Sequence, residues 1–179
     1  VEVKEEYVYL GVTFSCNGKF TKAIEKQVTQ ARKAMYALLH KAKILRLPFD
    51  IVLELYEHCV IPVLLYGSEV WGFENLHRLE VFHRQFLKLM LKTFKFTPNC
   101  MIYGETNTVD IRTKVDIRMV NFWLKLKSSK VKISVIMNAL LNKTYDDEND
   151  QKLRWPAKMK KYSYRGSFFP SMASTGCRL

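Results

Sequence analysis

The sequence contains few residues that interrupt helices and no long apolar run. Seven glycines and five prolines occur among 179 residues, which favours a helical chain with few turns. No stretch of 18 consecutive apolar residues is present, so a membrane-spanning helix is not predicted. A cleavable signal pattern is also lacking. These absences predict an intracellular protein, nuclear or cytoplasmic, without a transmembrane segment.

The cysteines and histidines lack the spacing of a metal site. Cys16, Cys59, Cys100 and Cys177 lie far apart, and no histidine stands three or four residues from a cysteine or another histidine. Zinc ligands on a helix need such steps to converge. We therefore predict no metal and no other cofactor, and we expect the cysteines to be reduced and buried.

Positive charge is what the sequence has in excess. Lys and Arg number 29 against 17 Asp and Glu, which gives a net charge of +12. Apolar residues at 48% and charged residues at 26% are ordinary for a globular domain, so the excess bears on partners rather than on the fold. A polyanion is the favoured partner: RNA, DNA or an anionic membrane.

The periodicity of apolar residues predicts a mainly α fold. From Ile24 to Leu45 such residues recur at alternating steps of four and three, which predicts a helix of about seven turns with one buried stripe. Strand-forming residues and the turn signal Asn17-Gly18 predict a short N-terminal β-hairpin. We therefore expect a bundle of five to six helices with a hairpin, the further helices spanning 49–65, 76–90, 97–103, 110–126 and 130–143.

The same patterns divide the chain into segments. A hairpin cannot fold alone, so this one must lean on the helices or on a sheet outside the sequence, and we expect the second. Pro62 should kink or end the second helix, and Trp71 and Trp123 should be buried anchors. The predicted segments are the hairpin (1–18), a helical domain (19–143), an acidic turn with a short basic helix (144–162) and a loose tail (163–179).

No catalytic constellation is recognisable. The run Tyr145-Asp146-Asp147 resembles the carboxylate turn at which polymerases bind two metal ions. Its tyrosine directly abuts the first aspartate, however, and its flanks are polar where that turn needs apolar strands. A solvated turn is the better interpretation. Gly67-Ser68 lacks the pattern of a nucleophile elbow, so no catalytic residue is predicted.

Two of the predicted helices carry outward rows of a single charge sign. Lysines and arginines that neutralise phosphates bind nucleic acid with little regard to sequence and with a strong dependence on salt. A run of like charges on a helix is ordinarily only a solvated surface. The net charge of +12 nevertheless favours a binding role for each row of cations taken as a whole. The candidate binding residues are Lys22, Lys26, Arg32 and Lys33 in the first row and Arg84, Lys88 and Lys92 in the second.

Four short segments, in this order, resemble blocks that follow the palm in the reverse transcriptases of non-LTR (LINE-type) retrotransposons. They are 7–12 (YVYLGV), 61–72 (IPVLLYGSEVWG), 97–105 (TPNCMIYGE) and 118–123 (RMVNFW). The resemblance covers roughly residues 7–126 and implies a primer-grip hairpin followed by a thumb. It also implies that the sequence, which begins with Val1, is a piece of a longer chain.

The resemblance implies roles for particular residues and partners. Tyr9, Leu10 and Gly11 would lie near the primer terminus, and the first basic row would follow the template–primer duplex. The sequence lacks the palm aspartates, so no polymerase activity is expected of it alone. The implied partners are RNA, DNA or an RNA–DNA hybrid, and an upstream palm and fingers domain of the same polyprotein. Two alternatives remain: a basic protein–protein or peripheral membrane module, and a relic of a decayed element without function.

Overall fold

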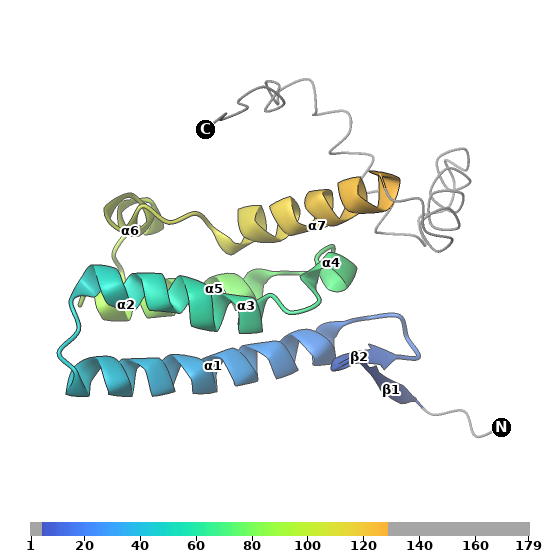
Figure 1. The fold of residues 1–179 in the computed structure, drawn as a ribbon, viewed down its shortest axis with the longest axis horizontal. Coiled ribbons are helices and arrows are strands. Elements are labelled where there is room, and N and C mark those ends of the chain that lie inside the picture. The colour runs from blue at the N-terminus through green and yellow to red at the C-terminus, as the bar shows by residue number, and fades with distance from the viewer. Residues whose placement is uncertain (1–4, 129–179) are drawn as a thin grey trace, which may run out of the picture. The chain divides into compact units, whose positions relative to one another are not determined.

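The structure, a computed structural model, describes residues 5–128 (Figure 1). These residues form a mainly helical fold with a short antiparallel hairpin at its N-terminal end, so the predicted fold class is confirmed. The helix over 130–143, the acidic turn, the basic helix over 152–162 and the tail lie outside the described residues. The elements are β1 (Glu6–Tyr9), β2 (Val12–Ser15), α1 (Thr21–Ile44), α2 (Phe49–Leu55), η1 (Tyr56–Val60), α3 (Ile61–Leu64), α4 (Ser68–Trp71), α5 (His77–Met90), α6 (Asn99–Thr106) and α7 (Ile111–Ser128).

The chain divides after Arg118 into two units, and α7 crosses the boundary. The first unit holds the hairpin, α1 to α6 and the start of α7. Asp110 begins α7 as the sequence predicted, because its Oδ1 accepts a hydrogen bond from the Thr113 backbone N–H at 3.3 Å. At α6, which was predicted to span 97–103, Pro98 stands at the N-cap position and the helix runs from Asn99 to Thr106. In the second unit, Trp123 is half-buried rather than fully buried.

Helix α1 buries one stripe and exposes the rest of its surface. Ile24, Ala31 and Met35 are buried as predicted, and α1 packs against η1, α3 and α5. The stripe ends before Leu45, which lies just beyond the helix and is exposed. One buried stripe leaves the opposite face of a 24-residue helix open to solvent.

The segment from Phe49 to Leu64 is one continuous helix that contains a π-helical turn, η1. It continues two residues beyond Pro62, so the proline does not end it. Proline supplies no N–H for the backbone ladder, and the wider turn immediately before it accommodates this loss. The π turn also shifts the buried face, so Tyr56 and Val60 are buried while Cys59 is exposed.

The prediction of buried cysteines is wrong for the described part of the chain. Cys16, Cys59 and Cys100 are free thiols, as expected, but all three are exposed. The α-helical spacing placed Cys59 on the core face, and the π turn rotates it away. Cys177 lies outside the described residues.

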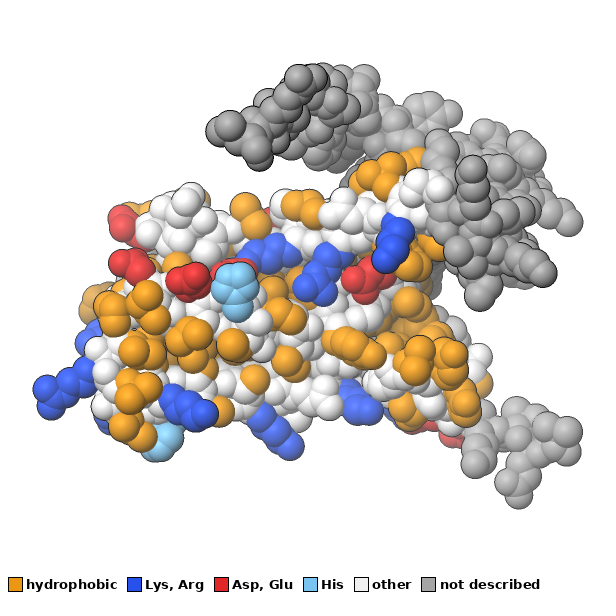
Figure 2. Space-filling view, viewed as in Figure 1, with side chains coloured by type: hydrophobic (Ala, Val, Ile, Leu, Met, Phe, Trp, Pro, Cys, Tyr) orange, Lys and Arg blue, Asp and Glu red, His pale blue; other side chains and the backbone are white. Residues whose placement is uncertain are grey.

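The hairpin leans on α1 through its second strand. Tyr9 pairs with Val12, and Leu10 and Gly11 form the turn with φ angles of 46° and 81°, the left-handed geometry that suits a two-residue hairpin turn. Val12 is buried, whereas every residue of β1 is exposed. Within the described residues β1 pairs with no strand other than β2, and hydrophobic side chains gather over the hairpin in Figure 2.

A glycine in the left-handed backbone conformation, Gly67, lies against the hairpin. Gly67 has a φ of 71°, and a Cβ built on it would lie 2.9 Å from Val12 Cγ2. Trp71 is fully buried beside it and donates a hydrogen bond from Nε1 to the Tyr66 carbonyl at 3.1 Å. The buried anchor predicted at Trp71 is therefore confirmed.

Replacing Gly67 with alanine is expected to lower the free energy of unfolding by about 3 kcal/mol, because left-handed strain adds to the contact with Val12. Gly18 is the matched control: its φ is 68°, but a Cβ there meets nothing within 4 Å. Gly18→Ala should cost only about 1 kcal/mol of strain. Urea unfolding of both variants measures the difference, and equal losses would show that the hairpin does not pack closely on Gly67.

Candidate nucleic-acid interface

Exposed cations line α1. Between Thr21 and Leu45 the sequence has six Lys or Arg residues and Glu25 as its one acidic residue, and all six cations are exposed. Figure 2 shows Lys and Arg side chains along the edge of the molecule formed by α1. These cations are Lys22, Lys26, Arg32, Lys33, Lys41 and Lys43.

The cations of α1 are mostly unneutralised. Lys22 forms an ion pair with Glu6 of β1. Because both side chains are largely exposed, this pair contributes little to stability and opens easily to a competing anion. Lys26 and Lys33 form no ion pair with any other described residue. Seven residues apart, they lie on the same side of the helix, two turns from each other.

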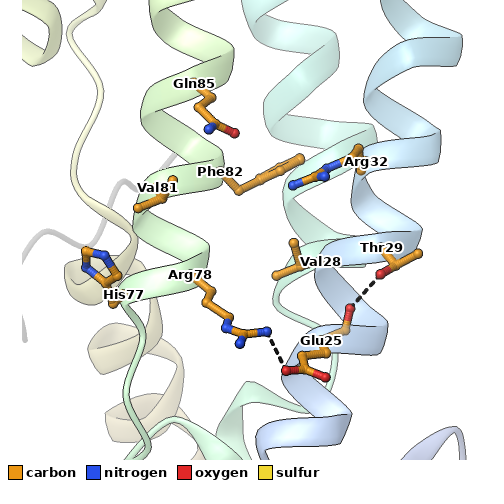
Figure 3. A pocket seen from close by; sticks show the side chains of 9 residues that line it. All are labelled: Glu25, Val28, Thr29, Arg32, His77, Arg78, Val81, Phe82 and Gln85. Carbon is orange, nitrogen blue, oxygen red and sulfur yellow. Dashed lines mark hydrogen bonds and ion pairs between the residues drawn. The ribbon is translucent and has the colours of Figure 1, made fainter. Parts of the chain in front are cut away.

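A surface groove of about 570 Å³ lies along the contact between α1 and α5 (Figure 3). The two helices run in the same direction, since Glu25 faces Arg78 at one end and Arg32 lies level with Gln85 at the other. Small or flat apolar side chains form the middle of the groove, and polar ones form its two ends. The lining residues are Glu25, Val28, Thr29 and Arg32 of α1 and His77, Arg78, Val81, Phe82 and Gln85 of α5.

Two arginines give the groove its charge. Arg78 donates a hydrogen bond to Glu25 as part of an ion pair, whereas Arg32 is exposed and has no ion-pair partner among residues 5–128. Arg78 was not among the residues predicted from the sequence. The sequence signal for Arg78 was that it stands seven residues before Gln85. This spacing puts both side chains on one face of α5.

The predicted row on α5 does not form a continuous surface. Arg84 is half-buried and lines a different, polar pocket with Glu80 and Asp110. Lys88 is half-buried and donates a hydrogen bond to the Lys95 carbonyl at 2.7 Å. Lys92 lies past the end of the helix with a φ of 52°. Arg84 and Lys88 therefore lie one turn apart within α5, and only Lys92 lies beyond its end.

The hairpin turn is tied to the segment that follows α3. The Tyr66 hydroxyl donates a hydrogen bond to the Leu10 carbonyl at 2.7 Å, and a Cβ on Gly11 would lie 3.5 Å from the Tyr66 ring. The side chains of Tyr9 and Leu10 point away from the core and are 56% and 72% exposed. Two segments that carry the family resemblance are therefore in contact, although about 55 residues separate them.

A buried polar cluster lies between η1, α5 and α6. Tyr56 and His83 are both buried, and the tyrosine hydroxyl is 2.9 Å from His83 Nδ1. Tyr103 donates a hydrogen bond to Glu80 Oε2 at 3.1 Å, and the other oxygen of Glu80 accepts one from the Arg112 backbone N–H at 2.8 Å. These bonds connect α5, which forms one wall of the groove, to α6 and to the start of α7.

Burial keeps the histidine of this cluster neutral. Desolvation lowers the pKa of His83 to about 4, and the Lys114 ammonium acts in the same direction. The backbone of Val109 and the Asp110 carboxylate act the other way and offset only part of the shift. Burial likewise raises the pKa of the Tyr56 hydroxyl. At neutral pH the two groups are therefore an uncharged hydrogen-bonded pair.

A metal centre and a membrane-spanning helix are both absent from the described residues. No three His, Cys, Asp or Glu side chains converge there as metal ligands would. Each helix within 5–128 is too short or too polar to span a bilayer. Comparisons of the chain with protein-family models, curated proteins and solved structures found no match. The resemblance to retrotransposon reverse transcriptases therefore stays a prediction carried by the sequence segments alone.

Proposed function

We propose that this protein binds the phosphate backbone of nucleic acid through α1 and the α1/α5 groove. In this proposal it is a thumb-like accessory segment of a retroelement RNA-directed DNA polymerase that grips the template–primer duplex and has no catalytic activity alone. The observation that carries the proposal is the exposure of all six cations of α1 on a helix with a single acidic residue. The choice of a template–primer duplex as the ligand rests on the segments that resemble the reverse transcriptase family.

The dimensions of α1 suit a duplex. Its 24 residues span about 36 Å, which is close to the length of ten base pairs at about 3.4 Å each. Lys26 and Lys33 lie about 10 Å apart along the axis, so they would contact phosphates three base pairs apart. Arg32, at the edge of the groove, adds a planar donor suited to a phosphate.

The hairpin supports the proposed upstream partner. β1 exposes Tyr7, Val8 and Tyr9 and has no strand on its outer edge among the described residues. An open edge with apolar side chains favours pairing with a neighbouring sheet. A palm domain preceding this segment in the same polyprotein would supply such a sheet.

Binding to an RNA–DNA hybrid should weaken by about 100-fold between 50 and 200 mM salt if about four phosphates are neutralised. The double variant Lys26→Gln/Lys33→Gln should bind more weakly at low salt. It should also reduce the slope of log affinity against log salt by about two, one for each lost phosphate contact. Fluorescence anisotropy with a labelled hybrid measures both quantities.

A second double variant controls for net charge. Arg112→Gln/Lys125→Gln removes two exposed cations that lie outside α1 and the groove, and it should leave the slope nearly unchanged. Equal losses in the two double variants would show that binding follows overall charge rather than α1. An affinity indifferent to salt, or no binding at low salt, would overturn the proposal.

A further inference from the structure

The loop between α5 and α6, residues 91–98, exposes two aromatic rings. Phe94 is 86% exposed and Phe96 is 92% exposed. Single exposed apolar residues are normal on a protein surface, but two nearly bare rings in one short loop are not. Lys92 and Lys95 alternate with them and are exposed as well, so flat apolar groups and cations occur side by side.

The backbone of this loop is fixed by hydrogen bonds. Past the end of α5, the Thr93 N–H donates to the Lys88 carbonyl at 3.1 Å, and the left-handed Lys92 donates to the Leu89 carbonyl at 3.3 Å. This pattern is the usual C-terminal cap of a helix. A turn bond of 3.1 Å from the Thr97 N–H to the Phe94 carbonyl follows.

A side chain of α5 adds a further tie. Lys88 Nζ donates to the Lys95 carbonyl at 2.7 Å, which holds the middle of the loop to the last turn of the helix. The two phenylalanine rings are therefore presented by an ordered backbone. Because the loop is already formed, a ligand that covers the rings needs little further ordering of the chain.

We propose that this loop is a binding site for single-stranded nucleic acid, in which unpaired bases stack on Phe94 and Phe96 while Lys92 and Lys95 contact the adjoining phosphates. Base stacking on exposed aromatic rings beside cations is the common physical basis of single-strand binding. The proposal rests on the proposed function and extends it from the paired to the unpaired part of the nucleic acid.

The position of the loop fits a strand that continues from the duplex. Because α1 and α5 run in the same direction (Figure 3), the loop after Met90 lies toward the end of the molecule where α1 terminates (Figure 1). Lys41 and Lys43 are exposed in that last part of α1. A strand leaving the duplex along α1 would meet the loop there.

The alternation of side chains favours nucleic acid over a lipid surface. Insertion into a membrane interface needs an apolar face with its cations on the opposite side. Here Lys95 stands between the two rings in the sequence, so burying both rings among acyl chains would draw its ammonium group down with them. A nucleic-acid strand instead alternates flat bases with charged phosphates, which matches the order of the loop.

The test uses the whole chain and three labelled probes of one sequence: a blunt RNA–DNA hybrid, the same hybrid with a six-nucleotide overhang, and the overhang strand alone. The overhang should raise affinity over the blunt hybrid. Phe94→Ala/Phe96→Ala should abolish this gain, a loss of about tenfold or more, while binding to the blunt hybrid stays unchanged. Because both side chains are almost wholly exposed, these substitutions leave the core intact.

Two further variants separate stacking from hydrophobicity. Phe94→Leu/Phe96→Leu keeps apolar side chains without flat rings and should lose the gain, whereas Phe94→Tyr/Phe96→Tyr should retain it. If the blunt hybrid binds and the overhang adds nothing, the loop proposal is overturned and the duplex proposal stands. If the single strand binds through the rings while the blunt hybrid does not, the duplex proposal is overturned and the loop proposal is supported.

The last part of the experiment measures binding to vesicles that contain anionic phospholipid. The loop proposal expects no difference in vesicle binding between the original chain and the Phe94→Ala/Phe96→Ala variant. Vesicle binding that depends on both rings, together with no effect of the rings on single-strand affinity, would overturn the proposal in favour of a membrane contact.

Discussion

Replacing Trp71 with alanine is expected to lower the free energy of unfolding by about 3–5 kcal/mol. The indole is fully buried, so its removal loses a large apolar contact and leaves a cavity. It also removes the hydrogen bond from Trp71 Nε1 to the Tyr66 carbonyl. Small domains are stable by only about 5–15 kcal/mol, so this one change removes a large share of the total. Denaturant unfolding followed by circular dichroism measures the loss.

Trp71→Phe separates the two contributions. It keeps most of the apolar volume and loses only the indole N–H, so it should cost clearly less than the alanine variant. The hairpin gives a second readout, because Trp71 packs beside Gly67, on which Val12 rests. Hydrogen exchange of the Val12 and Phe14 amides should accelerate in Trp71→Ala before global unfolding. An alanine variant as stable as the original would show that the indole is not an anchor.

The stability of the protein should fall by about 3 kcal/mol between pH 6.5 and pH 4 because of His83 alone. The pKa of His83 is about 4 in the folded chain, against an ordinary value of 6.5. In this pH window the unfolded chain therefore binds a proton that the folded chain does not, and stability is lost as pH falls. Above pH 6.5 the His83 ring is neutral in both the folded and the unfolded chain. Its contribution to the free energy of unfolding is therefore constant there.

Carboxylates also titrate at acid pH, so the effect is measured as a difference between variants. His83→Gln should flatten the dependence of unfolding free energy on pH between 6.5 and 4 relative to the original chain. The same slope in the original chain and in His83→Gln would show that His83 is protonated in the folded state. At the opposite extreme, the raised pKa of Tyr56 and Tyr103 predicts stability lost as pH rises above about 10.

The exposed surface of α1 was predictable because it follows from local periodicity. A stripe of apolar residues at steps of three and four fixes which side of a helix is buried, and the intervening cations must then face solvent. Lys26 and Lys33 are exposed for this reason. An N-terminal hairpin was predictable as well, but its turn lies at Leu10-Gly11, whereas the predicted turn signal Asn17-Gly18 follows β2.

The groove and the buried polar pair were not predictable in the same way. Whether Arg32 and Arg78 share a groove depends on which helices are neighbours and in which direction they run, and helix periodicity contains neither fact. His83 stands at helical spacing from Leu79 and Phe86, on the buried stripe of α5, but this spacing does not reveal its hydrogen-bond partner or its charge state. Its complete burial, the stacking of Tyr56 on its ring with centroids 5.7 Å apart and the hydrogen bond at Nδ1 distinguish it in the structure.

Two features of the surface have local causes. Cys59 was expected to be buried, and the π turn at Tyr56–Val60 turns it to the surface. In the row Arg84, Lys88 and Lys92, the last residue lies beyond α5, which ends at Met90 as predicted. Each is an effect of local backbone geometry, which sets the direction of the side chains that follow.

The sequence alone determined the helical class, the presence of an N-terminal hairpin and the charged face of α1, because each depends on neighbours within a few residues along the chain. The tertiary structure alone decided the α1/α5 groove, the neutral state of His83 and the contact between Tyr66 and the hairpin turn. These depend on residues 27 to 56 positions apart being brought together, and such contacts form only when burial of the shared core offsets the entropy of closing the chain between them.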